Sequence, residues 1–207
     1  MIYLAPSPSQ SLVRWMLDNH ELGLLCQPAS NLPLPGWIWA ADNGCFTGSW
    51  SEDKWLRWLA KTHPRSGCLF ATVPDVVGDH RATLQRFRLY ADKVRELAYP
   101  VGFVAQDGSD DGTVPWSEFD ALFIGGSTEW KMLLGAFALA REAVEMGKWV
   151  HVGRVNSMKR LAYWAEVAHS ADGTHMTYEP DKAAVRVKGW IQSLKQARQL
   201  SIQEDDK

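Results

Sequence analysis

Short apolar runs alternate with amphipathic stretches along the whole chain, which predicts βα units around a parallel sheet rather than an antiparallel sandwich. Eight runs have the length of strands: Met1–Ala5, Leu22–Cys26, Trp37–Ala41, Cys68–Val73, Val101–Ala105, Ala121–Ile124, Trp149–Val152 and a weaker Ala168–Ala171. Six stretches show helical spacing: Gln10–Asn19, Ser51–Lys61, Asp79–Leu97, Thr128–Met146, Ser157–Val167 and Pro180–Arg198. Eight strands, most of them followed by a helix, favour an α/β fold of the (β/α)8 barrel type over an open doubly wound sheet.

Polar residues at the predicted helix starts support these boundaries. Ser51 precedes two acidic residues, Asp79 precedes an arginine-rich helix, and Ser127 opens the predicted helix Thr128–Met146. A barrel of this size is near the lower limit for the fold, so some helices must be short or missing. The proline-broken segment Pro28–Gly36 is expected to replace one of them.

The length and composition set the domain organisation. At 207 residues and 46% hydrophobic, the chain suffices for one domain with a substantial core and is short for two. We expect one barrel domain over residues 1–200 and a polar C-terminal tail over residues 201–207. The first residues have no charged segment before a long apolar core, and no apolar run reaches the roughly 18 residues of a membrane span. We therefore expect a cytoplasmic protein without a membrane partner.

Charge and cysteine usage narrow the partners. The formal net charge is -2 and the pI is about 6.3, so a nucleic-acid partner would need a local basic patch rather than an overall positive field. The three cysteines are far apart and form no Cys-x-x-Cys pair. This pattern favours reduced thiols over a disulfide framework or a structural zinc site. We expect no metal and no cofactor.

Four aspartates follow apolar runs where the chain turns: Asp42, Asp75, Asp107 and Asp172. In a barrel, the carboxyl ends of parallel strands meet on one face, where these side chains would share a pocket and act in catalysis. Asp79 is expected to cap a helix, which leaves Asp75 as the site candidate of that turn. The alternative is that Asp42 and Asp172 only hold local amides in Asx or Asp-Gly turns.

Two further segments suit the recognition of a planar base. Gln106 offers a donor and an acceptor together, which matches a purine edge, although it can equally tie down its own loop. Gly125 and Gly126 end a strand and are expected to expose two amides to a carbonyl oxygen or a phosphate, unless they serve only loop geometry.

Three larger side chains complete the candidate site. Phe46 offers a stacking face for a base, although a lone aromatic residue is more often part of a core. Arg154 can hold a phosphate or orient an aspartate. His151 is a further binding candidate, although an isolated histidine at a strand end is more typical of a barrel interior.

Taken in chain order, these segments resemble the queuine tRNA-ribosyltransferase family, the tRNA-guanine transglycosylases, and especially their phage and bacterial relatives that insert 7-deazaguanines into DNA. Asp42–Phe46 resembles the family's Asp-Ser-Gly-Gly-Phe/Tyr turn, and Ala105–Gly108 its Gln-Gly-Gly turn. Phe123–Gly126 resembles its Ile-Gly-Gly strand end, and His151–Gly153 its Leu-Gly-Val-Gly segment. Ala171–Thr174 stands where the family carries its nucleophilic aspartate.

The resemblance covers about residues 37 to 176 and implies a role for each matched position. Asp172 would attack C1′ of a guanosine residue, and Asp42 would serve as general acid and base. The base edge would be read by Asp75, Gln106 and the Gly126 amide, and Phe46 would stack on the base. A pentosyltransferase that exchanges guanine for a 7-deazaguanine is thus expected, located in the host cytoplasm for a phage-encoded member.

The sequence departs from the family in two ways. The Cys-x-Cys-x-x-Cys and histidine zinc motif, which helps to shape the family's tRNA-binding surface, is absent from this sequence, which favours DNA over tRNA as the nucleic-acid partner. Asp107 replaces a glycine of the Gln-Gly-Gly turn and is expected to narrow the pocket or add a second acid. The sequence leaves open whether the protein has a partner subunit or forms a homodimer.

Two other functions remain alternatives. One is a glycosyltransferase or nucleosidase that acts on a free 7-deazapurine and a sugar phosphate, with the phosphate held by Arg154 and the Gly125-Gly126 amides. The other is a non-catalytic barrel that binds a base or a nucleic acid and never forms a covalent adduct.

Overall fold

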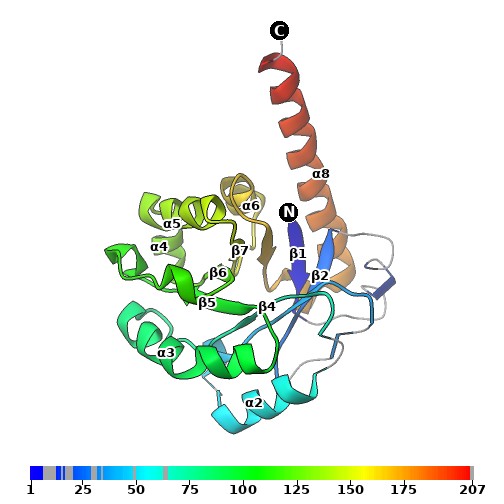
Figure 1. Ribbon diagram of the computed structural model, residues 1–207. Coiled ribbons are helices and arrows are strands. Elements are labelled where there is room, and N and C mark those ends of the chain that lie inside the picture. Colours follow the sequence, from blue (N-terminus) through cyan, green and yellow to red (C-terminus); the bar gives the residue numbers. More distant parts are fainter. Residues whose placement is uncertain are drawn as a thin grey trace.

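A closed barrel of eight parallel strands, paired in chain order, forms the centre of the molecule (Figure 1). The computed structural model describes residues 1–6, 13–14, 16, 21–28, 32–33, 35–48, 50–62 and 65–205. The strands are β1 (Ile2–Ala5), β2 (Leu22–Cys26), β3 (Trp39–Ala41), β4 (Cys68–Thr72), β5 (Val101–Ala105), β6 (Ala121–Ile124), β7 (Trp149–Val152) and β8 (Ser170–Asp172). The predicted compact (β/α)8-type barrel is confirmed.

Helices alternate with most strands on the outside of the barrel. They are α2 (Glu52–Lys61), α3 (His80–Glu96), α4 (Thr128–Lys131), α5 (Leu134–Glu145), α6 (Met158–Trp164), α7 (His175–Tyr178) and α8 (Pro180–Asp205). None of the helices in the described part of the chain is long and apolar enough to cross a membrane. Most of the predicted helix Gln10–Asn19 and part of Pro28–Gly36 lie outside the described residues.

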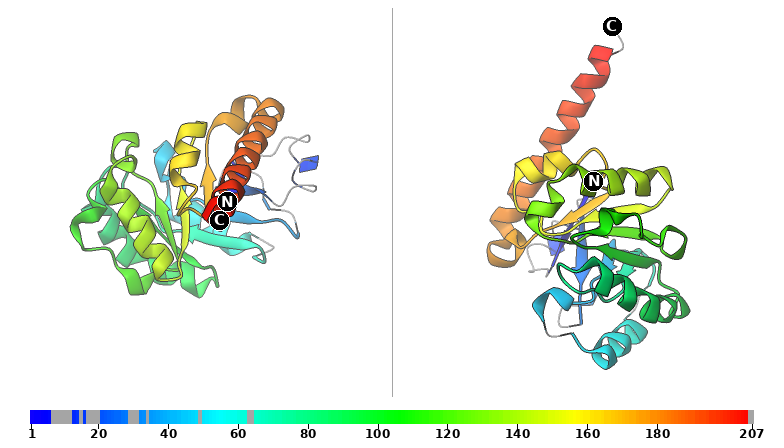
Figure 2. Two further views of the ribbon diagram at one scale, coloured as in Figure 1. Left: turned by 90° about the horizontal axis from the view of Figure 1, so that it is seen from above. Right: turned by 90° about the vertical axis from the view of Figure 1, so that its left-hand side faces the viewer.

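Two helix predictions need correction. The predicted helix Thr128–Met146 is two helices, because Leu133 between them has an extended backbone. The C-terminal helix does not end at Arg198 but runs to Asp205, since no glycine or proline interrupts its last residues. Seen from the side, α8 leaves the barrel and points away from it (Figure 2).

Side-chain caps fix the start of three helices, each at a strand-to-helix turn. The Asp79 carboxylate accepts a hydrogen bond from the Ala82 amide at 3.0 Å, as predicted for the α3 cap. Ser127 and Ser157 cap α4 and α6 in the same way. Ser51 precedes α2 without a side-chain cap bond. These short turns bring the strand ends and the helix starts to one face of the barrel.

The barrel interior is filled by side chains and is not a pore. Leu4, Leu25, Phe70 and their neighbours form a buried cluster inside the strands. The rings of Phe70 and Phe123 are 6.2 Å apart, and the His151 ring lies 4.5 Å from Phe123. Above this packed layer, at the carboxyl ends of the strands, Leu25 and Phe123 line a pocket.

Candidate functional site

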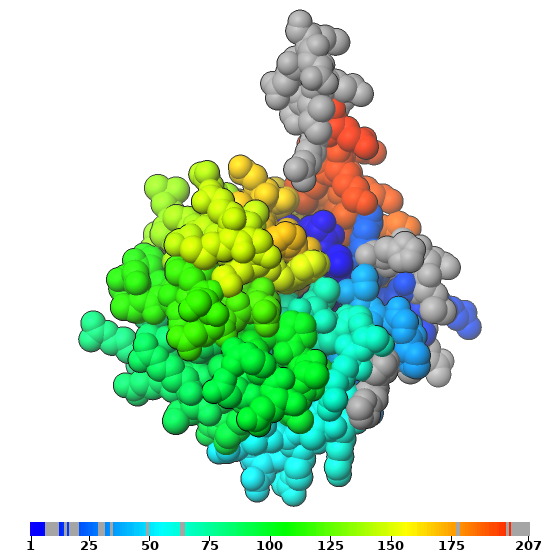
Figure 3. Space-filling view, in the orientation of Figure 1, coloured from blue at the N-terminus to red at the C-terminus, as the bar shows by residue number. Residues whose placement is uncertain are grey.

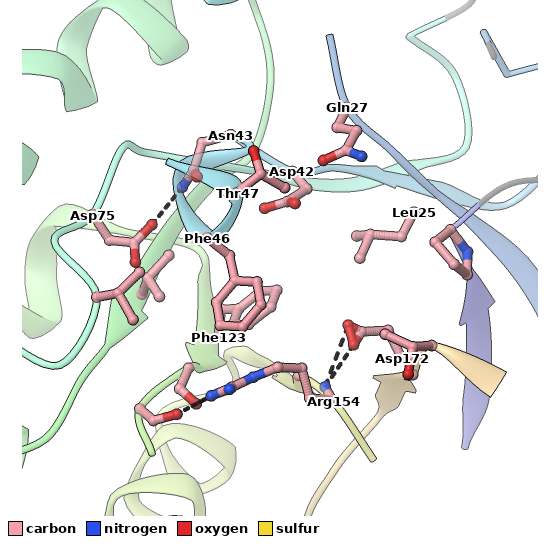
Figure 4. Close-up of a pocket in the computed structure, with 18 of the residues that line it drawn as sticks. Leu25, Gln27, Asp42, Asn43, Phe46, Thr47, Asp75, Phe123, Arg154 and Asp172 are labelled. Carbon is pink, nitrogen blue, oxygen red and sulfur yellow. Dashed lines mark hydrogen bonds between the residues drawn. The ribbon is translucent and has the colours of Figure 1, made fainter. Parts of the chain in front are cut away.

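A pocket of about 260 Å³ opens at the carboxyl ends of the strands (Figure 4). Eight of the nine residues predicted for the site line it: Asp42, Phe46, Asp75, Gln106, Gly125, Gly126, Arg154 and Asp172. They come from the ends of β3 to β8, so segments distant in the sequence meet in one place. In Figure 4, Asp42 and Asp172 face the open space from different sides.

Asp172, the last residue of β8, is held by main-chain hydrogen bonds. The Arg154 amide donates to Asp172 Oδ1 at 2.6 Å, and the Asp172 carbonyl accepts from the Val155 amide at 2.6 Å. Tyr3 from β1 donates its hydroxyl to the Val155 carbonyl at 3.0 Å. The next residue, Gly173, packs so tightly against Tyr3 Oη that a Cβ there would lie 2.2 Å away. The loop after β7 and the end of β8 therefore fix the carboxylate in one orientation.

Lys131 completes a chain of hydrogen bonds that ends at this carboxylate. Its Nζ donates to the Gly153 carbonyl at 2.5 Å, and that carbonyl belongs to the peptide whose N–H, on Arg154, donates to Asp172. Burial, followed by the nearby Arg154 charge, lowers the pKa of Lys131 to about 7. A donor on the carbonyl side of a peptide polarises its N–H, which strengthens the bond to the carboxylate.

Asp42 follows β3 on the other side of the pocket. Its main-chain amide donates to the Cys26 carbonyl at 2.7 Å, which fixes the start of the turn next to β2. Burial raises the pKa of the Asp42 carboxyl to about 7, and the negative charges of Asp75 and Asp172 act in the same direction. At neutral pH, this carboxyl group therefore exists in both its protonated and its ionised form.

Asp75 lies at the centre of a polar network beside Asp42. Asn43 Nδ2 donates to Asp75 Oδ1 at 2.9 Å, and Gln106 Nε2 donates to Asp75 Oδ2 at 2.6 Å. The Gln106 Oε1 atom accepts from the amides of Gly78 and Gly126, at 2.9 Å and 3.1 Å. Burial raises the pKa of the Asp75 carboxyl, while the Asn43 and Gln106 donors oppose that shift. The network holds a carboxylate and a carboxamide side by side on one wall.

The two glycine amides are not exposed, contrary to the sequence-based expectation. The Gly125 amide donates to the Ala105 carbonyl at 2.9 Å, and the Gly126 amide donates to Gln106. The Cβ of a residue at either position would clash, at 2.8 Å with Gln106 Nε2 for Gly125 and at 2.3 Å with the Trp130 ring for Gly126. The pair is therefore glycine because of close packing at the strand end, and in this structure its amides hold the pocket wall together.

Arg154 and Phe46 meet at the mouth of the pocket. Arg154 has a left-handed backbone with φ of 59°, which turns its amide toward Asp172. Its guanidinium group donates to the Gly125 and Gly126 carbonyls and lies over the Phe46 ring, 4.7 Å from the ring centroid. The Phe46 side chain is 62% exposed, so it is not a core residue. The guanidinium group and the ring are therefore stacked at the pocket mouth, beside the two carboxylates.

Two predicted positions lie elsewhere. His151 is fully buried beneath the pocket, with Nδ1 2.9 Å from Ser170 Oγ and Nε2 3.9 Å from Asp172 Oδ2, because its strand position points into the barrel. Asp107 neither narrows the pocket nor adds an acid to its lining. Its carboxylate accepts hydrogen bonds from the amide and the hydroxyl of Ser127, which ties the β5 and β6 loops together.

Two contributing residues were missed from the sequence. Asn43 orients Asp75, and its position directly after Asp42 at a strand end was an available signal. Lys131 lies within a predicted amphipathic helix, where a lysine normally faces solvent. Lys131 is buried because α4 ends there and approaches the loop after β7. The sequence pattern held no signal for this arrangement.

No protein-family model matches the chain, and no curated protein matches its sequence. Within the described ranges, no three His, Cys, Asp or Glu side chains are grouped so that they could hold a metal ion. The chemistry of the pocket consists of two carboxylates on different walls, a carboxylate–carboxamide pair, and an exposed aromatic ring stacked with an arginine.

Proposed function

We propose that the protein is a transglycosylase that exchanges guanine for a 7-deazaguanine base in a polynucleotide, through a covalent aspartyl-glycosyl intermediate. One observation carries the proposal: Asp42 and Asp172 line the same small pocket from different strands, one with a pKa of about 7 and the other oriented by a main-chain amide. Two carboxylates in such different environments suit acid–base catalysis and nucleophilic attack.

In the first half of the proposed reaction, the Asp172 carboxylate attacks C1′ of the target guanosine, and the bond between C1′ and N9 breaks. The electron pair of that bond leaves with guanine, and the protonated Asp42 carboxyl supplies a proton to the departing base. The products of this step are neutral guanine, ionised Asp42 and an ester between Asp172 and the sugar. The Arg154 amide keeps Asp172 Oδ1 in place before the attack.

In the second half, a 7-deazaguanine takes the place of guanine. The Asp42 carboxylate removes the proton from N9 of the incoming base, N9 attacks C1′, and the ester bond to Asp172 breaks. Both aspartates then have the protonation states with which they began. Because the Asp42 pKa is close to neutral pH, the same carboxyl group serves as acid in one half and as base in the other.

The remaining pocket residues suit a purine. The pocket volume of about 260 Å³ lies just below the range of about 300–1,000 Å³ typical of ligand sites, which favours a base over a larger ligand. Beyond the hydrogen bonds of the network, the Asp75 oxygens keep further lone pairs and Gln106 Nε2 keeps a second N–H, and these suit the donors and acceptors of a guanine edge. Phe46, with the Arg154 guanidinium over one face of its ring, supplies a largely exposed aromatic side chain for the base at the pocket mouth.

DNA is the acceptor we propose, in preference to tRNA. The order of the motifs resembles the DNA-modifying relatives of the tRNA-guanine transglycosylases, and the sequence has no Cys-x-Cys-x-x-Cys motif. No observation favours the sugar-phosphate alternative, because the Gly125 and Gly126 amides that would hold the phosphate already donate within the chain.

Incorporation of isotope-labelled guanine tests this function. Duplex DNA, single-stranded DNA and unmodified tRNA are incubated in parallel, with Asp172→Asn as the blank. Label should enter DNA only with the parent protein, and denaturing electrophoresis should show a protein–DNA adduct. Label in tRNA alone would overturn the choice of acceptor, and the absence of both label and adduct would overturn base exchange.

A further inference from the structure

A second hollow adjoins the catalytic pocket along α2. Its volume is about 920 Å³, and it shares Gln27, Asn43 and Thr47 with the lining of the pocket. The other wall is the surface of α2, which forms the lower edge of the molecule in Figure 3. A chain molecule lying in this hollow, which we call the α2 groove, would therefore pass next to Asp42.

A basic stripe follows the α2 groove. Lys54, Arg57 and Lys61 line it at spacings of three and four residues, so they share one face of the helix. All three are exposed, and none pairs with a carboxylate in the described part of the chain. By contrast, Lys93 and Lys182 on other helices do form ion pairs, with Glu52 and Glu179. Among the described residues, the positive charge of the groove thus has no paired carboxylate.

Aromatic surface lies beside this charge. Trp50 and Trp58 both line the groove, and both are only partly buried. The Arg86 guanidinium lies 5.2 Å from the centroid of the Trp50 ring, so that ring is held in place by a charge from α3. Rings that alternate with cations are the arrangement by which proteins bind single-stranded nucleic acids, since bases stack and phosphates pair.

We propose that the α2 groove binds the single-stranded segment that flanks the target nucleotide, with phosphates on the basic stripe and bases against Trp50 and Trp58. From Lys54 to Lys61 the helix rises about 10 Å, which is long enough for more than one phosphate of a single strand to contact the stripe. The net charge of -2 requires such a local patch for any polynucleotide. The identity of the target base rests on the proposed function, whereas binding to the groove does not.

A binding measurement tests the groove independently of the chemistry. Fluorescence anisotropy of a labelled single-stranded DNA oligonucleotide is compared between the parent protein and the double variant Lys54→Ala/Lys61→Ala. We expect Kd to rise at least tenfold and the slope of log Kd against log salt to fall by about 1.4, since each phosphate contact contributes about 0.7. The control is Arg88→Ala/Arg141→Ala, which removes two exposed charges from α3 and α5. It should change Kd less than twofold.

The outcomes separate the groove from the catalytic proposal. Equal weakening in both double variants would overturn the groove, because only the overall charge would then matter. Competition by polyglutamate as strong as by unlabelled DNA would also overturn it, in favour of an acidic protein partner. If the groove variant binds DNA as tightly as the parent and still exchanges the base, then the groove proposal is wrong and the proposed function is unaffected. If only the groove variant loses DNA binding, and the parent exchanges no base, then the groove proposal is supported and the proposed function is wrong.

Discussion

The two carboxylate-bearing walls of the pocket are built by different means. On the wall formed by β7 and β8, main-chain groups hold Asp172, and Lys131 supports them from behind. On the wall formed by β3 to β5, burial raises the pKa of the Asp42 carboxyl to about 7, and the charges of Asp75 and Asp172 act in the same direction. The difference separates the two tasks of the proposed reaction: one wall fixes the direction of an attack, and the other keeps a proton available at neutral pH.

The largest expected effect on base exchange comes from the wall formed by β7 and β8. Asp172→Asn removes the attacking oxygen while the Arg154 amide keeps an acceptor, so the fold should be preserved. We expect base exchange to fall by at least about 10⁴-fold, and no adduct to form. Quantitative label incorporation, with the melting temperature as a check on folding, measures this. Residual exchange within tenfold of the parent would exclude Asp172 as the nucleophile.

The corresponding substitution on the wall formed by β3 to β5, Asp42→Asn, should slow turnover but leave adduct formation detectable. Asp42→Asn cannot supply or accept the proton, so turnover should fall by about 10²–10⁴-fold, while the Asp172 adduct should still be detectable. In the parent, a limb of the pH–rate profile near pH 7 should report the Asp42 carboxyl, and the variant should lack that limb. An unchanged profile would remove Asp42 from the mechanism and end the functional distinction between the walls.

A substitution at Lys131 weakens the support of Asp172 on the β7 and β8 wall and leaves Asp172 itself unchanged. Lys131→Met keeps the length of the side chain but removes the donor to the Gly153 carbonyl, so Asp172 should lose part of its orientation. We expect kcat to fall by about 10–100-fold with KM nearly unchanged, since a hydrogen bond to a charged group is worth about 1.5–3 kcal/mol.

A matched control exists for this variant. Lys148 also donates from Nζ to a main-chain carbonyl, that of Phe119, at 2.7 Å, but it is not part of the pocket lining. Lys148→Met should therefore change stability without changing kcat. If both variants lower kcat equally, then Lys131 serves the fold in general and not Asp172.

The sequence predicted the wall formed by β3 to β5 better than the wall formed by β7 and β8. Asp42, Asp75 and Gln106 each follow an apolar run directly, so strand periodicity alone places them at the barrel mouth. The support of Asp172 depends on Lys131 and on the left-handed backbone of Arg154, which arise from packing between distant segments. For the same reason, the sequence did not reveal that the Gly126 amide donates a hydrogen bond to Gln106 Oε1.

The smallest effect concerns the pH dependence of stability. A carboxyl group whose pKa rises on folding, from about 4 to about 7 for Asp42, favours the folded state at low pH, and this contribution is lost as the pH rises between these two values. Asp42→Asn removes the ionisation, so at pH 8 the variant should be more stable than the parent by about 1–3 kcal/mol, with little difference near pH 4. Urea unfolding from pH 4 to pH 8 measures this, with Asp181→Asn on the exposed start of α8 as the control for losing one carboxylate. A variant that is less stable at pH 8 would show that the Asp42 charge is well compensated, and the contrast between the two walls would then lie in geometry alone.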